Sequence, residues 1–117
     1  MSAVSLMTQV HVCDVQDVPR GEGIRVERDG LPEPIAVFND DGRFYALSDT
    51  CSHGQSSLAE GDVRDCQVEC AMHWGRFDLK TGKACGLPAV LPVQAYPVTV
   101  TGGRIYVTVP GGGDERW

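Results

Sequence analysis

The sequence predicts an all-β domain in which short antiparallel strands form a sandwich or a small barrel. Apolar and polar residues alternate over several short stretches, whereas few stretches show the longer period of a helix. Tight turns are expected to be frequent, because the chain contains 14 glycines and 7 prolines. The 117 residues suffice for one domain, so we expect a single domain over residues 1–117.

The first half of the chain contains two predicted strands and one predicted hairpin. Residues 9–15 and 23–28 alternate apolar and polar side chains, as strands with one buried face do. Residues 34–38 and 44–47 are largely apolar and flank the sequence Asn-Asp-Asp-Gly at 39–42. Because Asp-Gly favours the positive φ angles of a tight hairpin turn, we expect these two strands to pair.

Two more hairpins are predicted further along the chain. Residues 96–100 and 104–109 flank the sequence Thr-Gly-Gly, in which glycine can supply a positive φ. Residues 63–70 can form a shorter hairpin around Asp65 and Cys66, which would bring the segments on either side of it together. The glycine-rich, charged residues 111–117 are expected to form a frayed tail.

Charge and hydropathy narrow the classes of function. Ten Lys and Arg against 16 Asp and Glu give a net charge of −6. This charge argues against nucleic acid and anionic membranes as partners, and permits steering toward a basic protein. No apolar run approaches the roughly 18 residues of a membrane span. Residues 1–9 lack the basic start of a signal peptide, so we expect a cytoplasmic protein.

Cysteine usage indicates metal or redox chemistry. The chain has five cysteines, and a cytoplasmic protein with this many rarely uses them as disulfides. One residue separates Cys51 from His53, sixteen residues follow His53, and two residues separate Cys70 from His73. Two thiolates and two imidazoles can hold one zinc ion or a sulfide-bridged pair of irons. The knuckle spacing of many structural zinc sites is absent, although Cys66 with Cys70 leaves zinc formally open.

This pattern resembles the signature of Rieske proteins, C-x-H followed by C-x-x-H, in which two histidines replace two cysteines on one iron. The flanking residues agree with the resemblance. Gly54 follows the first histidine, residues 73–78 resemble the second cluster loop, and residues 79–83 resemble the turn after it. Residues 86–89 resemble the proline loop that covers the cluster in this family, and the whole resemblance covers about residues 42–109.

The resemblance implies a cofactor, a ligand set and a fold. The cofactor is one [2Fe–2S] cluster, and its iron ligands are Cys51, His53, Cys70 and His73. The fold is a Rieske-like antiparallel sandwich with a small cluster-binding subdomain over about residues 48–92.

The sequence departs from the respiratory Rieske subtype at four positions. Ser56 and Met72 stand where that subtype has disulfide cysteines, and Gly75 and Phe77 stand where it has serine and tyrosine hydroxyls. The chain also shows no membrane anchor. Hydrogen bonds from those hydroxyls to cluster sulfur favour the reduced state. Gly75 and Phe77 have no hydroxyl, so we expect a low reduction potential, about −150 mV.

Low-potential soluble Rieske proteins of this length resemble the ferredoxin components of bacterial aromatic-ring-hydroxylating dioxygenases. The resemblance implies a monomeric electron carrier, not an enzyme, that passes single electrons from a flavoprotein reductase to the terminal oxygenase. The aromatic substrate stays open, because the carrier does not contact it. Three alternatives also stay open: the Rieske small subunit of an assimilatory nitrite reductase, a structural zinc module for protein interactions, and an enzyme that uses Cys51 and His53 as a thiol–imidazole pair.

The segments around the ligands carry no charged side chain. Residues 51–59, 70–75 and 84–92 contain no Lys, Arg, Asp or Glu, so their convergence would form an uncharged tip that includes Leu58. Such a tip suits a short-lived redox complex or shields the cluster from water. The other cysteines, Cys13, Cys66 and Cys85, receive no role from the sequence; Cys13 is expected to be a buried apolar filler.

Overall fold

The computed structural model describes residues 7–50, 57–70, 75–86 and 91–110, which form eleven strands and two short 3-10 helices. The strands are β1 (Met7–Asp14), β2 (Gly23–Val26), β3 (Ile35–Asp40), β4 (Arg43–Ser48), β5 (Asp62–Arg64), β6 (Gln67–Glu69), β7 (Arg76–Asp78), β8 (Ala84–Gly86), β9 (Ala95–Tyr96), β10 (Val98–Thr101) and β11 (Arg104–Pro110). The 3-10 helices are η1 (Val15–Asp17) and η2 (Leu58–Glu60). Within these ranges no helix is long and apolar enough to cross a membrane.

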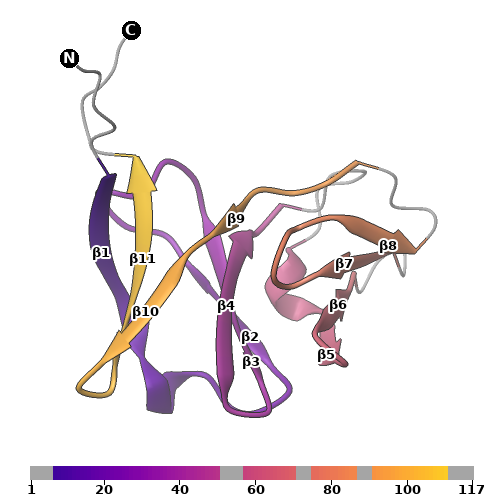
Figure 1. Ribbon diagram of the computed structural model, residues 1–117, viewed down its shortest axis with the longest axis horizontal. Coiled ribbons are helices and arrows are strands. Elements are labelled where there is room, and N and C mark those ends of the chain that lie inside the picture. Colours follow the sequence, from indigo (N-terminus) through magenta and orange to yellow (C-terminus); the bar gives the residue numbers. More distant parts are fainter. Residues whose placement is uncertain (1–6, 51–56, 71–74, 87–90, 111–117) are drawn as a thin grey trace, which may run out of the picture.

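The strands form three antiparallel sheets in three layers (Figure 1). One outer sheet has the order β1-β11-β10, the middle sheet has the order β2-β3-β4-β9, and the other outer sheet has the order β5-β6-β7-β8. Met7 and Pro110, the first and last described residues, pair with each other in the first outer sheet. The all-β antiparallel sandwich predicted from the sequence is confirmed.

The middle sheet is buried on both faces because β3 is apolar on both of its faces. Ile35 and Val37 belong to the cluster shared with the β1-β11-β10 sheet, whereas Ala36 and Phe38 belong to the cluster shared with the β5–β8 sheet. All four side chains are fully buried. Burial of each large one contributes roughly 1.5–3 kcal/mol, so β3 stabilises both layers at once.

Two predicted hairpins are confirmed with their turns. β3 and β4 pair through Asp41 (φ 53°) and Gly42 (φ 93°), and the Gly42 N–H donates to Asn39 Oδ1 at 2.7 Å. β10 and β11 pair through Gly102 (φ 58°) and Gly103 (φ 78°). Positive φ at both central residues matches the right-handed twist of the strands, which explains why these sequences end one strand and begin the next.

The prediction of one continuous strand over residues 96–100 is wrong. β9 ends at Tyr96 and pairs with β4, whereas β10 begins at Val98 and pairs with β11. Pro97 lies between them, and its carbonyl accepts the Thr108 N–H at 3.0 Å. Proline has no N–H to donate to a ladder, so the chain changes from the middle sheet to an outer sheet at this residue.

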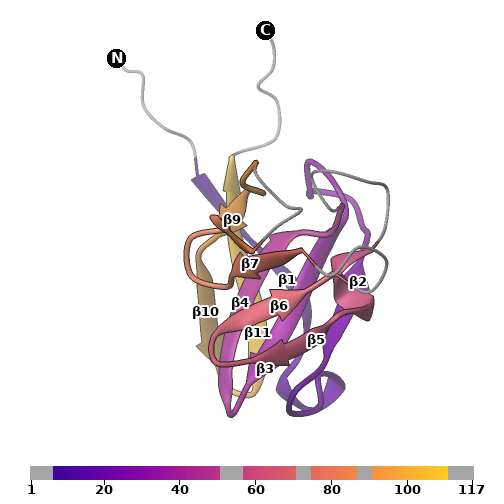
Figure 2. The ribbon, with the colours of Figure 1, turned by 90° about the vertical axis from the view of Figure 1, so that its right-hand side faces the viewer.

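The short β5–β8 sheet contains one predicted hairpin and one that was not predicted. β5 and β6 pair through Asp65 (φ 53°) and Cys66 (φ 61°), as expected from residues 63–70. β7 and β8 also pair, through a turn in which the Thr81 hydroxyl and N–H both donate to Asp78 Oδ2. Figure 2 shows this sheet in front of the other two layers.

Candidate metal centre

Cys70 is the one predicted ligand within the described residues, since Cys51, His53 and His73 lie outside them. It directly follows β6 and is fully buried in a cluster that includes Val68 and Phe77. The Cys70 N–H donates to the Gly75 carbonyl at 2.7 Å. This bond joins the two described ends of the segment 71–74, and it continues the pairing of β6 with β7 by one residue.

The segment 51–56 is closed at its base by a second set of contacts. Thr50 and Ser57 form an isolated antiparallel bridge, and the Leu58 N–H donates to the Asp49 carbonyl at 2.6 Å. Asp49 Oδ1 also accepts the Ser57 hydroxyl at 2.8 Å and the Ala59 N–H at 3.0 Å. The described residues on the two sides of this segment are therefore bound directly to each other.

A third segment, 87–90, lies between β8 and residues that return to the small sheet. The Val93 N–H donates to the Gly82 carbonyl at 2.9 Å. A Cβ built on Gly82 would lie 2.0 Å from the Val93 carbonyl oxygen, and Gly82 has φ of 79°. Only glycine permits this approach without strain, and the approach fixes where the chain re-enters the described fold after 87–90.

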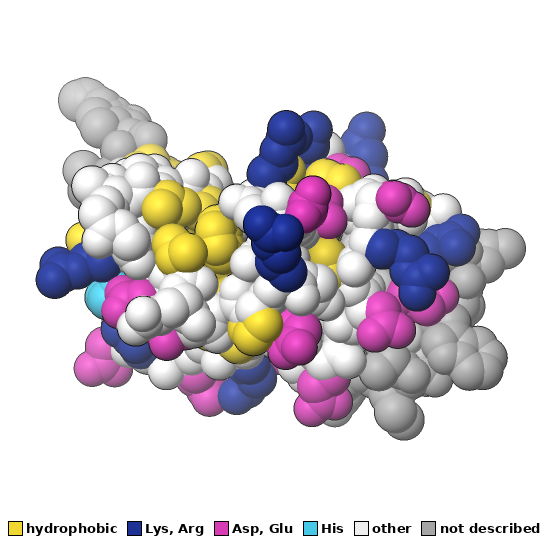
Figure 3. Space-filling view, turned by 90° about the horizontal axis from the view of Figure 1, so that it is seen from below, with side chains coloured by type: hydrophobic (Ala, Val, Ile, Leu, Met, Phe, Trp, Pro, Cys, Tyr) yellow, Lys and Arg dark blue, Asp and Glu magenta, His cyan; other side chains and the backbone are white. Residues whose placement is uncertain are grey.

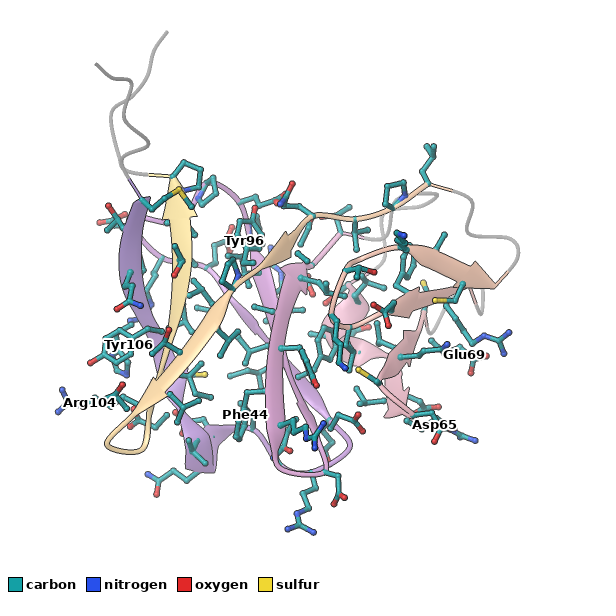
Figure 4. All side chains as sticks on the ribbon, viewed as in Figure 1. Phe44, Asp65, Glu69, Tyr96, Arg104 and Tyr106 are labelled. Atoms are coloured by element: carbon teal, nitrogen blue, oxygen red, sulfur yellow. The ribbon has the colours of Figure 1, made fainter. Side chains whose placement is uncertain are left out.

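Val93 is bonded to Gly82 in the β7–β8 turn, at one end of the β5–β8 sheet. Both described flanks of the segment 71–74 and the start of the segment 87–90 lie at the opposite end. The register there runs from Asp62 to Glu69, then to Arg76, then to Gly86, so β5 and β7 begin where β6 and β8 end. Glu69 lies at this end, and Asp65 lies at the opposite end, in the β5–β6 turn. Both side chains are labelled on this sheet in Figure 4.

Close packing brings the exit of the first segment to the same place. A Cβ on Gly61, which follows η2, would lie only 2.1 Å from the Glu69 carbonyl oxygen. The absence of a side chain therefore lets the connection from η2 to β5 contact the last residue of β6. The predicted hairpin of β5 and β6 is present, and it brings Gly61 close to Glu69, which directly precedes Cys70. The predicted contact between the segments 51–56 and 71–74 themselves lies outside the described residues.

These observations fit an iron–sulfur cluster with mixed ligands. The Cys70 sulfur is buried among apolar side chains, and no hydrogen-bond partner for it is found among the described residues. Within the same residues, no group of three His, Cys, Asp or Glu side chains gathers that could hold a metal ion. Thiolate and imidazole ligands from the segments 51–56 and 70–74, which have described flanks at the Glu69 end of the sheet, would form the donor set of a Rieske cluster.

Gly75 and Phe77 are two buried residues near Cys70 whose side chains have no hydroxyl group. Gly75 is buried beside Cys70 through their backbone hydrogen bond, and Phe77 is fully buried in the cluster that contains Cys70. Neither can donate a side-chain hydrogen bond to sulfur. Leu58 does not belong to an exposed tip, so that expectation is wrong: the first turn of η2 directs it into the core, where it is fully buried.

Of the remaining residues of ligand type, Cys13 and His11 lie away from this sheet end, whereas Cys85 directly precedes Gly86 in β8. Cys13 is buried between the middle sheet and the β1-β11-β10 sheet, which confirms its expected role as an apolar filler. Burial raises its pKa to about 11, and the nearby Asp17 and Asp14 carboxylates contribute. His11 contacts Asp14 Oδ1 at 2.9 Å on β1. Cys85 is exposed at an irregularity of β8, where its thiol donates to the Lys83 carbonyl.

Charges of both signs lie close together on the described surface. The face shown in Figure 3 has Asp and Glu side chains interspersed with Lys and Arg side chains. On the outer face of the small sheet, a shallow depression of about 120 Å³ is lined by both signs: Asp62, Arg64, Gln67, Glu69 and Arg76. On this face, electrostatic steering would depend on the overall charge of −6, because acidic and basic side chains alternate there.

Comparison with known proteins identifies the family. The Rieske [2Fe-2S] domain model matches residues 8–97. The 3-phenylpropionate/cinnamic acid dioxygenase ferredoxin subunit of Escherichia coli K12 is 47% identical over 105 residues, which are 89% of this chain and 96% of that protein.

Two solved structures share the fold over almost their whole length. The Sphingomonas yanoikuyae B1 ferredoxin has a TM-score of 0.81 and 32% identity, covering 88% of this chain and 100% of that chain. The ferredoxin matched in a complex of reduced oxygenase and oxidized ferredoxin in carbazole 1,9a-dioxygenase has a TM-score of 0.79 and 35% identity, covering 91% and 97%. With its buried Cys70 and its three anchored segments, the chain belongs to the Rieske [2Fe–2S] domain family, as a ferredoxin with one cluster that carries electrons and is not itself a catalyst.

Proposed function

We propose that this ferredoxin passes single electrons from a flavoprotein reductase to the terminal oxygenase of an aromatic-ring-hydroxylating dioxygenase. In this proposal, Cys51, His53, Cys70 and His73 hold the cluster, and the cluster-binding part spans about residues 48–92 within a single domain. The chain acts as a cytoplasmic monomer, with no nucleic acid and no membrane as partner.

The observation that carries the ligand assignment is the position of Cys70. Cys70 is fully buried directly after β6, and its N–H donates to the Gly75 carbonyl across the segment that contains His73. The flanks of the segment that contains Cys51 and His53 are bonded to each other and packed against the same strand end. Two ligand pairs from two neighbouring segments are what a two-iron cluster requires.

When bound, the cluster takes up and releases one electron. The described residues on the two sides of the segments 51–56 and 71–74 are bonded to each other, which would anchor both segments around the cluster. Cys70 is shielded from water by Val68, Phe77 and Leu79. The absence of side-chain hydroxyls at Gly75 and Phe77 supports a potential near the lower end of the Rieske range, about −150 mV.

The relatives support the choice of an oxygenase as the electron acceptor. The E. coli relative is named as the ferredoxin subunit of a dioxygenase, and one structural neighbour was solved together with its oxygenase. The nitrite reductase alternative is less well supported, because 47% identity over nearly the whole chain links this protein to a dioxygenase subunit. The substrate of the oxygenase remains open, since these two relatives serve different aromatic compounds.

The direct test combines cofactor analysis with reconstitution. We expect anaerobically purified protein to contain two irons and two acid-labile sulfides per chain, with the low average g value of a histidine-ligated cluster. Cys51→Ser, His53→Ala, Cys70→Ser and His73→Ala should each abolish that signal. One zinc ion with no sulfide would refute the ligand assignment.

The partner assignment is tested with purified components. Stopped-flow mixing of the reduced ferredoxin with an aromatic-ring dioxygenase oxygenase should reoxidise the ferredoxin and reduce the oxygenase, with a siroheme nitrite reductase as the control acceptor. Faster transfer to the siroheme protein would favour the nitrite reductase alternative. A flavoprotein reductase with NADH should reduce the ferredoxin in the same assay.

A further inference from the structure

Asp49 is a buried ionisable residue that lies outside the predicted ligand set. It is 2% exposed, and among the buried polar residues of the described part (Asn39, Ser48 and Asp49) it alone can carry a charge. A buried carboxylate is costly unless it is paired and hydrogen-bonded, so its surroundings need a physical explanation.

Four donor groups bind the Asp49 carboxylate and its backbone carbonyl. Arg25 Nε donates to Oδ2 at 3.1 Å and forms an ion pair with the carboxylate. Oδ1 accepts the Ser57 hydroxyl at 2.8 Å and the Ala59 N–H at 3.0 Å, and the carbonyl accepts the Leu58 N–H at 2.6 Å. All three of the latter donors lie on the far side of the segment 51–56.

These contacts replace a local helix cap. Ser57 is the N-cap residue of η2 but makes no side-chain cap hydrogen bond there. The first two N–H groups of η2, on Leu58 and Ala59, are instead satisfied by the Asp49 carbonyl and carboxylate. The start of η2 is therefore fixed by a residue that precedes the ligand-bearing segment, and the Ser57 hydroxyl is used to strengthen the same connection.

We propose that Asp49 is the residue that positions the ligand segment containing Cys51 and His53, by closing its base with a buried carboxylate. The inference rests on the proposed ligand set. Asp49 stands two residues before Cys51 and reaches Ser57 and Ala59 across the segment, so a shift of its side chain would move both ends. It is a positioning residue and touches no ligand atom in this account.

The carboxylate has a second, measurable consequence. A negative charge buried close to a redox centre disfavours the reduced state, because reduction adds an electron in a medium of low effective dielectric constant. Arg25 offsets part of this charge, but its side chain is 47% exposed and is shared with Glu27 at 3.0 Å. Removal of the Asp49 charge should therefore raise the reduction potential, whereas a purely structural role would not require a shift in that direction.

The test uses the loaded ferredoxin and four variants. Asp49→Asn keeps an oxygen for Ser57 and Ala59 but removes the charge. Ser57→Ala removes one of the two bonds to Oδ1, and Asp49→Ala removes both. Asp41→Asn is the control, because it removes one charge from the β3–β4 turn, where Asp41 is 86% exposed. The readouts are iron content, the electron paramagnetic g values, the midpoint potential and the rate of iron release to a chelator.

The expected results form a graded series. Asp49→Ala should release iron about tenfold faster than wild type or more, since it leaves buried donors unsatisfied. Ser57→Ala should shift the g values with a smaller gain in release rate. Asp49→Asn should retain the cluster and show a higher midpoint potential than the Asp41→Asn control.

The failure of this inference and the failure of the proposed function give different results. If wild type itself shows no histidine-ligated cluster, the ligand set fails. If wild type shows the cluster, but Asp49→Asn and Ser57→Ala match the control in g values, potential and release rate, the role of Asp49 is refuted. These two variants decide the matter even where Asp49→Ala does not fold, since both preserve an acceptor or donor at the site.

Discussion

The two outer sheets cover opposite faces of the same middle sheet, yet they differ in how much structure they contain. β1 and β11 have eight and seven residues and pair along most of their length. Each strand of the β5–β8 sheet has three residues. Short strands make few ladder hydrogen bonds, so the small sheet depends on contacts outside itself, whereas the larger sandwich is held by its own pairing and core.

The small sheet obtains those contacts from two sources. Val68, Phe77 and Leu79 pack against Phe38 and Leu47 of the middle sheet. The bound cluster would provide the second source, because a metal centre ties together segments that are otherwise joined only at their ends. The part of the fold proposed to hold the cluster is therefore also the part with the shortest strands, and we expect it to depend most on the bound cluster.

The largest effect should come from the core of the small sheet. Phe77→Ala removes a fully buried ring beside Cys70 and should lower the free energy of unfolding by about 3–5 kcal/mol. Ile105→Val, in the core of the larger sandwich, should cost only about 0.5–1.5 kcal/mol and leave the cluster spectrum unchanged. Urea unfolding with visible circular dichroism measures both. Equal retention of the cluster in the two variants would contradict the comparison.

Removal of iron should destabilise the small sheet and leave the larger sandwich unchanged, a more selective effect than that of Phe77→Ala. We expect amide exchange in β6 and β7 to become about 100-fold faster in the apoprotein, equivalent to about 2.7 kcal/mol of local stability. The amides of Ile105, Val107 and Val109 in β11, all fully buried, should keep their protection. Hydrogen exchange followed by mass spectrometry resolves the two regions, and uniform loss of protection would show that they unfold as one unit.

The third prediction concerns the redox properties of the small sheet. Gly75→Ser with Phe77→Tyr adds the two hydroxyls that the site lacks. If both reach sulfur, each hydrogen bond is worth about 1 kcal/mol, and the midpoint potential should rise by about 50–100 mV in total. Gly75→Ala is the matched control, since it adds a Cβ without a hydroxyl. A double variant with the potential of that control would mean that the hydroxyls do not reach the cluster.

The comparison also explains which features could be predicted from the sequence. The turns at Asp41-Gly42 and Asp65-Cys66 were predictable because they join strands that are adjacent in sequence. The change of sheet at Pro97 depends on which strand each side pairs with, and local alternation does not contain that information. β7 and β8 were missed although they are as long as β5 and β6, because five residues separate them, whereas a two-residue turn joins β5 to β6.

The candidate site was predictable in its ligand types but not in its supports. The spacing of Cys51, His53, Cys70 and His73 pointed to the family before any fold was known. Asp49 gave no comparable signal, because its role depends on Arg25 and Ala59, which are distant from it in sequence or act through the backbone. Leu58 was misplaced for the same reason: its burial follows from the direction of η2 rather than from its uncharged neighbours.

The smallest predicted effect lies in the larger sandwich and is a dependence of stability on pH. Cys13 is buried, and its folded-state pKa is raised from 9.0 to about 11. The folded state therefore keeps a proton that the unfolded state loses, so this residue contributes stability below about pH 9, and the contribution is lost as the pH rises through about 11. Cys13→Ala should cost about 1 kcal/mol at pH 7, for a small cavity, and should show a shallower decline between pH 9 and 11. Urea midpoints at several pH values under reducing conditions measure this difference. Parallel declines for the variant and wild type would mean that the Cys13 thiol ionises as readily in the folded protein as in the unfolded chain, and that the sandwich core around it is more open to water than its burial indicates.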